Sequence, residues 1–450
     1  MVISGRLVLL QLLGIIPAVI WPTPNVVFGW FAAVVALGIV DAMAAASPKK
    51  LLVKRNEPVA TRVGQHTESQ IVLRNPTSRR LRAVVRDAWT PSAHAADSRH
   101  RVALRPGDGA RIATGLQPTR RGILESGPVV VRSYGPLGLI GRQRSLPVTS
   151  QVRVLPAFHS RRHLPSKLAR LRELDGHSAV QIRGEGTEFD SLREYVIGDD
   201  VRSIDWRASA RRADVVVRTW RPERDRRVLI IVDTGRTSAM RTEDGTRLEA
   251  GIEATLLLSA LAAHAGDHVE VLAFDSARRA AIHTDTTHDV LATVANGLMS
   301  LEPALVETNW EKVAGWVAQH HRQRSLVVLV TGLEPAPLEA GLLPVIGHLT
   351  RRHTVILASA TAGGGPKAAG GDPATAAPKE ALPASSDAFV SNAFVPDAFD
   401  TAANARWELD RAGVSAQLQQ AGVHVVDRPA SDLASALSDR YLDLKSMGEL

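Results

Sequence analysis

The sequence predicts an α/β protein in which an N-terminal transmembrane helical hairpin is followed by a β-sandwich-like domain and a doubly wound parallel sheet. Two apolar stretches lie within residues 1–48, and short runs rich in Val, Ile and Leu fill residues 51–155. From residue 228 onward, buried strands alternate with helices. At 450 residues the chain has room for two or three domains, at least one of them with a sizeable core.

The first 48 residues predict two membrane-spanning helices. Apolar residues run from Leu7 to Trp21 and from Val26 to Ala46, with the turn WPTPN between them. Each stretch is close to the roughly 20 residues that a helix needs to cross a bilayer, and Pro17 is expected to kink the first helix. Asp41 lies near enough to the end of its span to reach headgroup water. A cleaved signal peptide is the alternative for the first span, but a second apolar segment with a basic stop follows at once.

The flanking charges predict the orientation of these spans. Arg6 precedes the first span, Lys49, Lys50, Lys54 and Arg55 follow the second, and the loop between them is uncharged. By the positive-inside rule, both termini and everything after residue 50 are expected in the cytoplasm, with the chain held in the inner (cytoplasmic) cell membrane.

The composition excludes several classes of function. The chain has no cysteine, which rules out disulfides, thiolate nucleophiles and cysteine metal sites. Its net charge of +8 is uneven, because residues 49–150 carry 19 Lys and Arg against 6 Asp and Glu, whereas residues 231–450 carry 17 against 27. A basic front half on a membrane protein fits anionic headgroups or an acidic partner. Nucleic acid is not expected, since the basic region lacks stacking aromatics and a recognition helix.

Residues 51–155 are predicted to form the β-sandwich-like domain. Its expected strands are separated by turn signals such as Asn-Pro, and they read SQIVLRN, LRAVVRDAW, RVALRPG, ARIATGL, GPVVVRSYG and SQVRVLPAF. Residues 156–227 follow as a linker and a densely charged segment, with LPSKLARLREL as one short amphipathic helix.

The doubly wound sheet is predicted in two parts, residues 228–361 and 404–450. Its strands are VLIIVD, HVEVLAFD, SLVVLVTGL, TVILASAT and VHVVD, and the intervening apolar patterns are helical. Residues 362–403 are rich in Ala, Gly, Pro and Ser, and are therefore predicted to be a disordered insertion.

The end of the first buried strand is the candidate metal site. It reads D233-T-G-R-T237-S, and an Asp followed by hydroxyl residues offers the oxygen ligands that Mg²⁺ prefers. The pattern resembles the metal-ion-dependent adhesion site of von Willebrand factor A domains, whose first loop reads Asp-x-Ser-x-Ser. Thr308 is the expected counterpart of that family's loop Thr. The first hydroxyl is replaced by Gly235 and the later acid by Gly332, so only weak Mg²⁺ binding is expected, and no other cofactor.

Other sequence patterns favour no catalytic site. The chain contains no phosphate-binding loop, nucleophile elbow or HExxH pair. The histidine pairs His264/His268 and His320/His321 are expected to be solvated.

The charged segment carries the broadest resemblance. Its signature consists of Gly184, Gly186, Glu188, Phe189, Leu192, Arg193, Tyr195, Gly198, Asp199, Asp200, Arg202, Asp205, Trp206, Ala210 and Arg211. This pattern resembles the domain of unknown function 58 family, in which a von Willebrand-type A domain follows the signature. The resemblance extends from the paired N-terminal spans through GPLGL to the closing YLDLK.

The family resemblance implies that the chain binds a protein partner, and it does not indicate a catalysed reaction. Members of that family are commonly encoded beside MoxR-type AAA+ ATPases, which implies a non-enzymatic, membrane-held adaptor for such an ATPase in chaperone-like assembly or cell-envelope processes. The interleaved charges are predicted to be an ordered joint that fastens the segment to the following sheet and exposes part of its surface to a partner. Two alternatives stay open: a metal-dependent hydrolase that uses acids of residues 184–212, and an exported cation-dependent adhesion module. The oligomeric state is left open.

Overall fold

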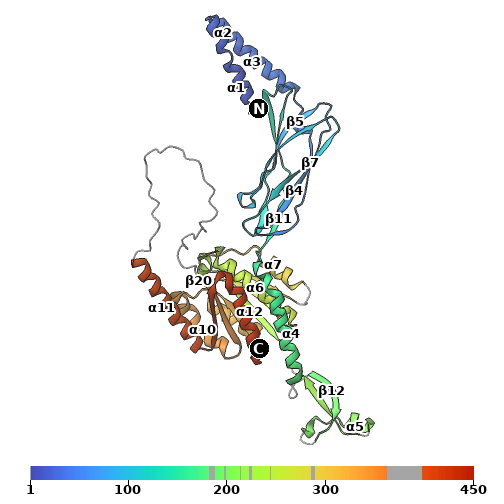
Figure 1. Cartoon of the computed structure of the whole chain (residues 1–450), viewed down its shortest axis with the longest axis vertical. Helices are drawn as coiled ribbons and strands as arrows, with labels where there is room; N and C mark the ends of the chain where they lie inside the picture. The colour runs from blue at the N-terminus through green and yellow to red at the C-terminus, as the bar shows by residue number, and fades with distance from the viewer. Residues whose placement is uncertain are drawn as a thin grey trace, which may run out of the picture. The chain divides into compact units, whose positions relative to one another are not determined.

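The computed structural model describes residues 2–181, 188–196, 199–212, 214–221, 226–243, 245–284, 289–361 and 398–450. The chain divides into two compact units, Met1–Ala157 and Phe158–Leu450 (Figure 1). Both contain β-sheets and the second is rich in helices, so the predicted mixed α/β class is confirmed. The predicted insertion lies largely outside the described residues, but residues 398–403, which were assigned to it, are helical.

The apolar N-terminal region forms the helices α1 (Gly5–Leu12), α2 (Ile15–Ile20) and α3 (Pro24–Ala44), followed by the 3₁₀ turn η1 (Pro48–Lys50). Within the described residues, one helical stretch, Pro24–Lys50, is long and apolar enough to cross a membrane. The first predicted span is shorter and is broken at Leu13 and Gly14. Pro17 lacks the N–H that would bond to the Leu13 carbonyl, which favours a break one turn before it.

The first unit contains three sheets with the strand orders β1-β10-β9-β5-β6, β2-β4-β7 and β3-β11-β8. Their bounds are β1 (Val2–Ile3), β2 (Leu52–Asn56), β3 (Thr61–Arg62), β4 (Thr67–Arg74), β5 (Leu81–Arg86), β6 (Arg99–Leu104), β7 (Gly109–Leu116), β8 (Gly122–Glu125), β9 (Val129–Tyr134), β10 (Ile140–Leu146) and β11 (Gln151–Leu155), with the turn η2 (Pro91–Ala93). Alternate residues of β5, namely Leu81, Ala83 and Val85, are buried. They share one core with Ile71 of β4 and Ile112 of β7.

A buried ion pair lies in this unit. The Arg55 Nη2 donates to Asp87 Oδ1 at 2.6 Å, and both side chains are almost fully buried. The Trp89 indole N–H donates to the other Asp87 oxygen at 3.2 Å, and the Arg55 guanidinium lies over the Trp89 ring. Burial lowers the pKa of Arg55, although the charge of Asp87 opposes that shift.

Asp41 joins α3 to the β unit. Its carboxylate is buried and accepts the backbone N–H groups of Leu137 at 2.8 Å and Leu139 at 2.7 Å. A Cβ on Gly135 would lie 2.3 Å from Asp41 Oδ1, so this position has no room for a side chain. Gly138 has a φ of +70°, a backbone conformation that favours glycine. Asp41 therefore does not face headgroup water, as the sequence predicted, but holds the loop that precedes β10.

The second unit is built on a six-stranded sheet with the order β18-β17-β14-β19-β20-β21. Every neighbouring pair is parallel except β17 and β18. The strands and helices of the sheet region are β14 (Arg227–Asp233), η5 (Arg236–Ala239), β15 (Arg241–Thr242), β16 (Gly245–Thr246), α6 (Arg247–His264), β17 (His268–Phe274), β18 (Arg278–His283), α7 (Val290–Leu298), α8 (Trp310–His320), β19 (Leu326–Val330), α9 (Pro335–Pro337), the π-helical turn η6 (Leu338–Leu342), α10 (Leu343–Thr350), β20 (Thr354–Thr361), α11 (Ala398–Gln420), β21 (Val423–Pro429) and α12 (Ala430–Met447).

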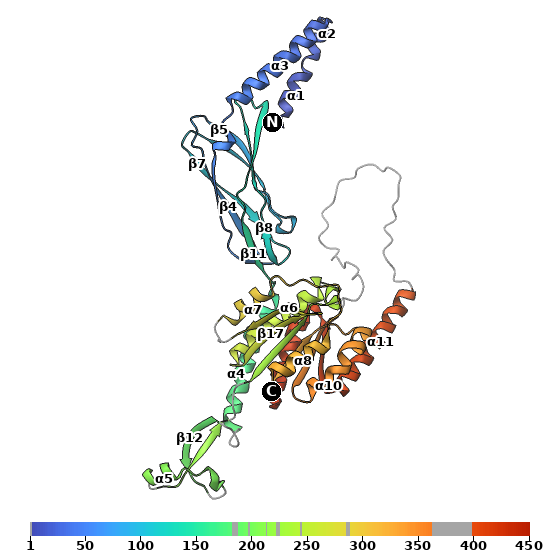
Figure 2. The same cartoon turned by 180° about the vertical axis from the view of Figure 1, so that it is seen from behind.

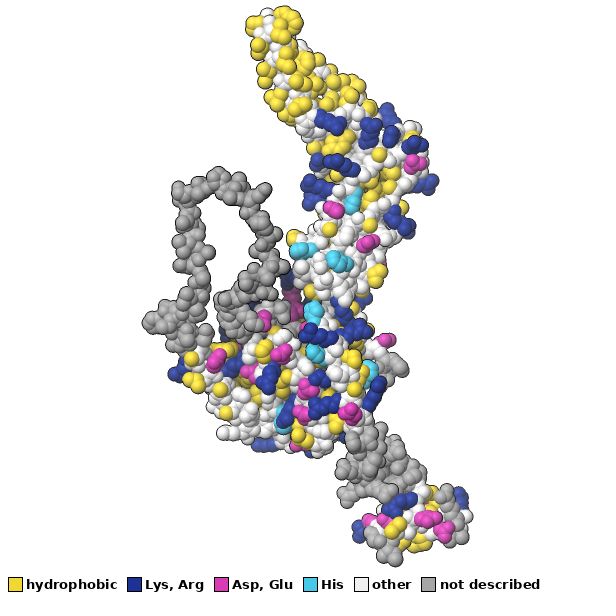
Figure 3. Space-filling model, viewed as in Figure 1, with side chains coloured by type: hydrophobic (Ala, Val, Ile, Leu, Met, Phe, Trp, Pro, Cys, Tyr) yellow, Lys and Arg dark blue, Asp and Glu magenta, His cyan; other side chains and the backbone are white. Residues whose placement is uncertain are grey.

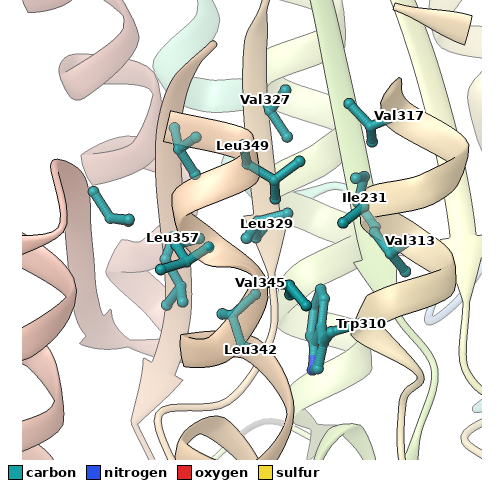
Figure 4. Close-up of a cluster of buried hydrophobic side chains, with 14 of the residues drawn as sticks. Ile231, Trp310, Val313, Val317, Val327, Leu329, Leu342, Val345, Leu349 and Leu357 are labelled. Atoms are coloured by element: carbon teal, nitrogen blue, oxygen red, sulfur yellow. The ribbon is translucent and has the colours of Figure 1, made fainter. Parts of the chain in front are cut away.

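Helices cover both faces of this sheet (Figure 2). On one face, Trp310 and Val313 of α8 and Leu349 of α10 pack against the strand residues Ile231 and Leu329 (Figure 4). Helices α6 and α12 pack against each other and against strands β14 and β20. These two buried faces account for the continuous apolar strands in the sequence.

Before the sheet lie η3 (His159–His163), α4 (Leu164–Gln181), β12 (Glu188–Glu194), η4 (Val201–Ser203), α5 (Trp206–Arg212) and β13 (Val216–Arg221). Helix α4 packs against α6 and α12, and Lys167 lies 2.6 Å from Asp439 of α12. The closing YLDLK motif forms part of α12. The buried Tyr441 hydroxyl donates to Asp267 at 2.5 Å, and the Lys445 amine donates to the same carboxylate at 3.1 Å.

Candidate functional site

The Asp233 carboxylate is the centre of a polar cluster at the carboxyl end of β14. The strand order reverses at β14, and crevices form at such points in open α/β sheets. One carboxylate oxygen accepts the N–H of Gly235 at 2.7 Å and the hydroxyl of Thr308. The other accepts the hydroxyls of Thr237 at 3.0 Å and Thr331 at 2.5 Å. Asp233 is buried, and both of its oxygens are occupied by donors.

The three residues predicted as metal ligands, Asp233, Thr237 and Thr308, thus lie together. Sequence reasoning missed Thr331. The signal was its position directly after the buried strand β19, which is the parallel neighbour of β14, so that its hydroxyl reaches the same edge of the sheet.

A buried guanidinium lies beside this cluster. Arg247, at the start of α6, donates to the Glu334 carboxylate through Nη1 at 2.8 Å and Nη2 at 2.7 Å. Its Nε donates to the Ala360 carbonyl at 3.0 Å. A Cβ on Gly332 would lie 1.9 Å from a Glu334 oxygen and 2.2 Å from Arg247 Nη1. The ion pair therefore fills the space that an acid at position 332 would need.

These residues, arranged in this way, do not fit a Mg²⁺ site. A hard cation needs several oxygen ligands with free lone pairs, yet each Asp233 oxygen already accepts two hydrogen bonds, one oxygen from Gly235 and Thr308 and the other from Thr237 and Thr331. The second carboxylate, Glu334, is bound on both oxygens by Arg247. Across the described part of the chain, no group of three or more His, Asp or Glu side chains is placed to hold a metal ion.

A groove of about 390 Å³ opens over the cluster, and its lining includes Asp233, Thr331 and Trp310. At its rim the exposed Arg236 donates to Glu307 at 2.8 Å through Nε. A volume of this size holds a small ligand or a few side chains of a partner.

The signature segment forms a separate two-stranded antiparallel sheet, in which β12 pairs with β13. Near the end of β12, Arg193 binds the Asp199 carboxylate with two bonds, at 2.7 Å and 2.5 Å, and the Val196 N–H donates to the same carboxylate at 2.9 Å. The bond from Arg193 is the main reason that the pKa of Asp199 is lowered and that the pKa of Arg193 is raised. This fork closes the turn that follows β12.

Asp205 fixes the start of α5. Its Oδ1 accepts the N–H groups of Arg207 at 3.1 Å and Ala208 at 2.9 Å, in the manner of a helix cap. Its Oδ2 accepts from Arg218 of β13 at 2.9 Å. These bonds, the one from Ala208 first, lower the pKa of Asp205. The Ser209 hydroxyl, which sequence reasoning missed, accepts the Val216 N–H at 2.9 Å and ties α5 to β13.

The remaining signature residues fall into three groups. Leu192 and Tyr195 are half-buried, and Asp200 caps η4 by accepting the N–H of Arg202 at 3.0 Å. The side chains of Arg202, Trp206, Ala210 and Arg211 are exposed. Gly184, Gly186 and Gly198 lie outside the described residues, and only the backbone of Glu188 and Phe189 is described.

The two ion pairs described for this segment are internal. Arg193 binds Asp199 and Asp205 binds Arg218, and no described ion pair reaches from residues 188–221 to the six-stranded sheet. These two pairs stabilise the fold of the segment itself.

The fold and these two regions define a mixed α/β protein with a polar cluster at the strand ends and an exposed charged hairpin. Residues 191–361 match the family model described as "Protein of unknown function DUF58". That match supports the resemblance to this family, and it covers β13, the polar cluster and the sheet from β14 to β20. No curated protein matches the chain.

Three solved structures are similar to parts of the chain. The SpRpn10 VWA domain has 10% identity and a TM-score of 0.28, over 48% of this chain and 94% of that one. The CARDB domain of the PF1109 protein from Pyrococcus furiosus has 15% identity and a TM-score of 0.18, over 23% and 91%. A family 123 glycoside hydrolase from Clostridium perfringens has 8% identity and a TM-score of 0.16, over 23% and 28%. At these TM-scores, none of the three similarities establishes a common fold.

Proposed function

We propose that the chain is a membrane-anchored adaptor that faces the cytoplasm and binds a MoxR-type AAA+ ATPase in chaperone-like assembly or cell-envelope processes. The observation that carries the proposal is Trp206, whose side chain is 69% exposed within the signature segment. Val196 and Val201 of the same segment are each 62% exposed. Large apolar side chains in water on a polar segment are typical of a surface that a protein partner covers.

The internal ion pairs support this role, because they hold the apolar side chains in place before a partner arrives. Val196 lies in the turn closed by Arg193 and Asp199, and Trp206 directly follows the helix cap Asp205. A preorganised surface loses less conformational entropy on binding than a flexible one. The choice of an AAA+ ATPase as the partner comes from the family resemblance of the signature.

The proposed anchor is a hairpin of two spans with both ends in the cytoplasm. Two attachments support it: β1 pairs with β10 through Ile3 and Ile140, and Asp41 near the end of α3 binds the loop before β10. Both ends of the apolar region thus meet the same part of the β unit. The first stretch, Gly5–Ile20, would reach about 24 Å as a helix, so its crossing needs local thinning of the bilayer.

The architecture of the adaptor is proposed to be β-sandwich-like in the first unit and von Willebrand factor A-like in the second. The core shared by β4, β5 and β7 supports the former. The strand order of the six-stranded sheet, with Asp233 at its reversal point, supports the latter. In this proposal the groove over Asp233 works without a cation, because hydrogen-bond donors occupy both Asp233 oxygens and the Arg247–Glu334 pair fills the space beside Gly332.

The adaptor is proposed to have no catalytic activity. A general acid at neutral pH needs a raised pKa, whereas Arg193 lowers the pKa of Asp199 and the helix-capping bonds lower that of Asp205. These two acids of the signature segment, Asp199 and Asp205, are committed to structural bonds.

The test is a binding measurement on the full chain in nanodiscs, with a purified MoxR-type ATPase and ATP as the probe. Trp206→Asp is expected to weaken binding roughly tenfold or more, as for other central interface aromatics. Leu409→Asp is the matched control, because Leu409 is also exposed, at 70%, in the same unit. No binding by the wild type, or equal binding by the Trp206 variant, would contradict the proposal. Circular dichroism establishes that each variant is folded.

A further inference from the structure

We infer that the end of the first unit next to α3 binds the anionic phospholipid headgroups of its own membrane. The binding surface is a basic collar, defined as Arg6, Lys49, Lys50, Arg79, Arg80 and Arg82, whose side chains are all exposed. This inference rests on the membrane anchoring proposed above and adds a lipid preference to it.

Three collar residues contact the point where the apolar helices leave the β unit. The Arg79 Nη1 donates to the carbonyl of Met43 in the last turn of α3. Arg82 donates to the Pro136 carbonyl at 3.2 Å, and Arg6 donates to the Leu137 carbonyl at 3.3 Å. Lys49 and Lys50 follow α3 directly in η1. Figure 3 shows the dark blue side chains gathered below the yellow apolar helices.

The acidic side chains of this unit are placed differently. Asp41 lies at the collar, but it is buried and its carboxylate is bound by backbone N–H groups. Glu68 lies at the end of β4 away from the collar, since it pairs with Gly115 whereas Arg74 pairs with Gly109. Asp108 is the exposed acid on the collar side, and it accepts the Arg105 N–H at 3.3 Å. Among residues 2–157, no described ion pair neutralises a collar residue, so the positive charge is available to an external anion.

An exposed leucine at the same place favours a lipid surface over an acidic protein. Leu137 is 50% exposed, and its loop is held by Asp41, Arg6 and Arg82. At the end of a membrane helix, such a side chain enters the headgroup layer while neighbouring cations meet the phosphates. Because Leu137 lies beside the ends of the apolar helices, where a headgroup layer is expected, a lipid surface accounts for the apolar tip and the cations together.

The experiment places an environment-sensitive dye on the collar, which is simple because the chain has no cysteine. The full chain carries Ser78→Cys labelled with a nitrobenzoxadiazole dye, in phosphatidylcholine nanodiscs with or without phosphatidylglycerol. Phosphatidylglycerol is expected to raise the emission and shift it to the blue, and about 0.5 M salt is expected to reverse both changes. A label at Ala96→Cys, an exposed site near the other end of the β unit, is expected to respond to neither.

Charge-reversal variants distinguish the effect of the collar residues from the effect of the overall net charge of the protein. Arg79→Glu with Arg80→Glu, or Lys49→Glu with Lys50→Glu, is expected to remove at least half of the response to phosphatidylglycerol. Arg86→Glu with Arg99→Glu makes the same change in charge at a pair of residues that face each other at the far end of β5 and β6, and is expected to leave the response intact.

The outcomes distinguish the collar from the anchor. A chain that does not enter nanodiscs overturns both proposals. A chain that enters them, with a dye at position 78 that is indifferent to phosphatidylglycerol, overturns the collar alone and leaves an acidic protein as the partner of these cations. ATPase binding is measured separately, so its failure does not affect the collar.

Discussion

The Asp41 carboxylate lies 2.7 Å from the backbone nitrogen of Leu139, a residue 98 positions later in the chain. It binds Leu137 through its other oxygen, and the close approach at Gly135 leaves no room for a side chain there. The carboxylate of an acid in an apolar helix thus links that helix to the β unit by hydrogen bonds, which we call the Asp41 clasp.

Removal of this clasp is expected to destabilise the first unit. Asp41→Ala leaves two buried N–H groups without an acceptor, and we expect a loss of about 1–3 kcal/mol in the free energy of unfolding. Hydrogen exchange of residues 135–140 should accelerate locally in the full chain in detergent. Asp108→Ala, at an exposed acid in the same unit, serves as the control. Unchanged exchange in the Asp41 variant would show that the clasp contributes nothing.

The cluster around Asp233 is expected to be indifferent to divalent cations. Because Arg247 and Glu334 fill the space beside Gly332, neither Mg²⁺, Mn²⁺ nor a chelator should shift the melting temperature of the wild type. Gly332→Asp is expected to destabilise the sheet by about 1–3 kcal/mol through overpacking.

A double variant sharpens this test. Gly332→Asp combined with Arg247→Ser adds the missing acid and removes the guanidinium, so a stabilising effect of Mn²⁺ is expected in this variant alone. Saturable Mn²⁺ binding by the wild type, followed by electron paramagnetic resonance, would refute the cation-free assignment.

The buried pair Arg55–Asp87 is expected to be sensitive to the loss of one partner. Asp87→Asn leaves a guanidinium with a lowered pKa buried without its counter-charge, and we expect a loss of about 3–5 kcal/mol. Arg55→Met combined with Asp87→Leu should recover much of it. In the exposed pair Arg236–Glu307, Glu307→Gln should cost about 0–1 kcal/mol in denaturant unfolding. Similar losses in the free energy of unfolding for the two pairs would contradict the conclusion that burial makes Arg55–Asp87 more sensitive.

Stability is also expected to fall in mild acid because of His353. Burial, followed by the charges of His321 and Arg352, lowers the pKa of His353, so the folded protein keeps this imidazole neutral. The unfolded chain protonates it below about pH 6.5. Its contribution is therefore complete above that pH and is lost as the pH falls toward the folded-state pKa. The pKa of His424 is lowered in the same direction.

The measurement is urea unfolding at pH 7.5 and 5.5. His353→Gln should reduce the loss of stability between these two values, whereas substitution of the exposed His264 should not. Losses below about pH 4.5 belong to carboxylates such as Glu270, whose pKa is lowered by His321 and His283 against the effect of burial. An unchanged pH slope in the His353 variant would rule out this source.

The local sequence pattern was sufficient to predict the buried parallel strands of the second unit. Runs such as VLIIVD and SLVVLV are apolar throughout, because both faces of a parallel sheet are covered, and they became β14 and β19. The strand β18 was missed, since RRAAIH is an edge strand with mostly polar or small side chains and gives no such signal. His321 was expected in water but is buried against Glu270, a contact between β17 and the end of α8 that spacing does not reveal.

Only part of the polar cluster could be predicted, because sequence spacing does not reveal tertiary contacts. Asp233, Thr237 and Thr308 follow a known spacing, whereas the pairing of Arg247 with Glu334 joins residues 87 positions apart and depends on the tertiary fold. The predicted helix LPSKLARLREL extends beyond its apolar pattern to Gln181 as α4.

The strand β1 imposes an order of assembly on the nascent chain. Val2 and Ile3 are synthesised before the other strands of this unit, whereas their partners in β10 are among the last of those strands to be made. The apolar helices between them are synthesised in the meantime and can enter the bilayer while the sheet is still open. In the proposed anchoring, closure of the sheet edge by β1 follows insertion of these helices, so the β unit is completed after its apolar helices have entered the bilayer.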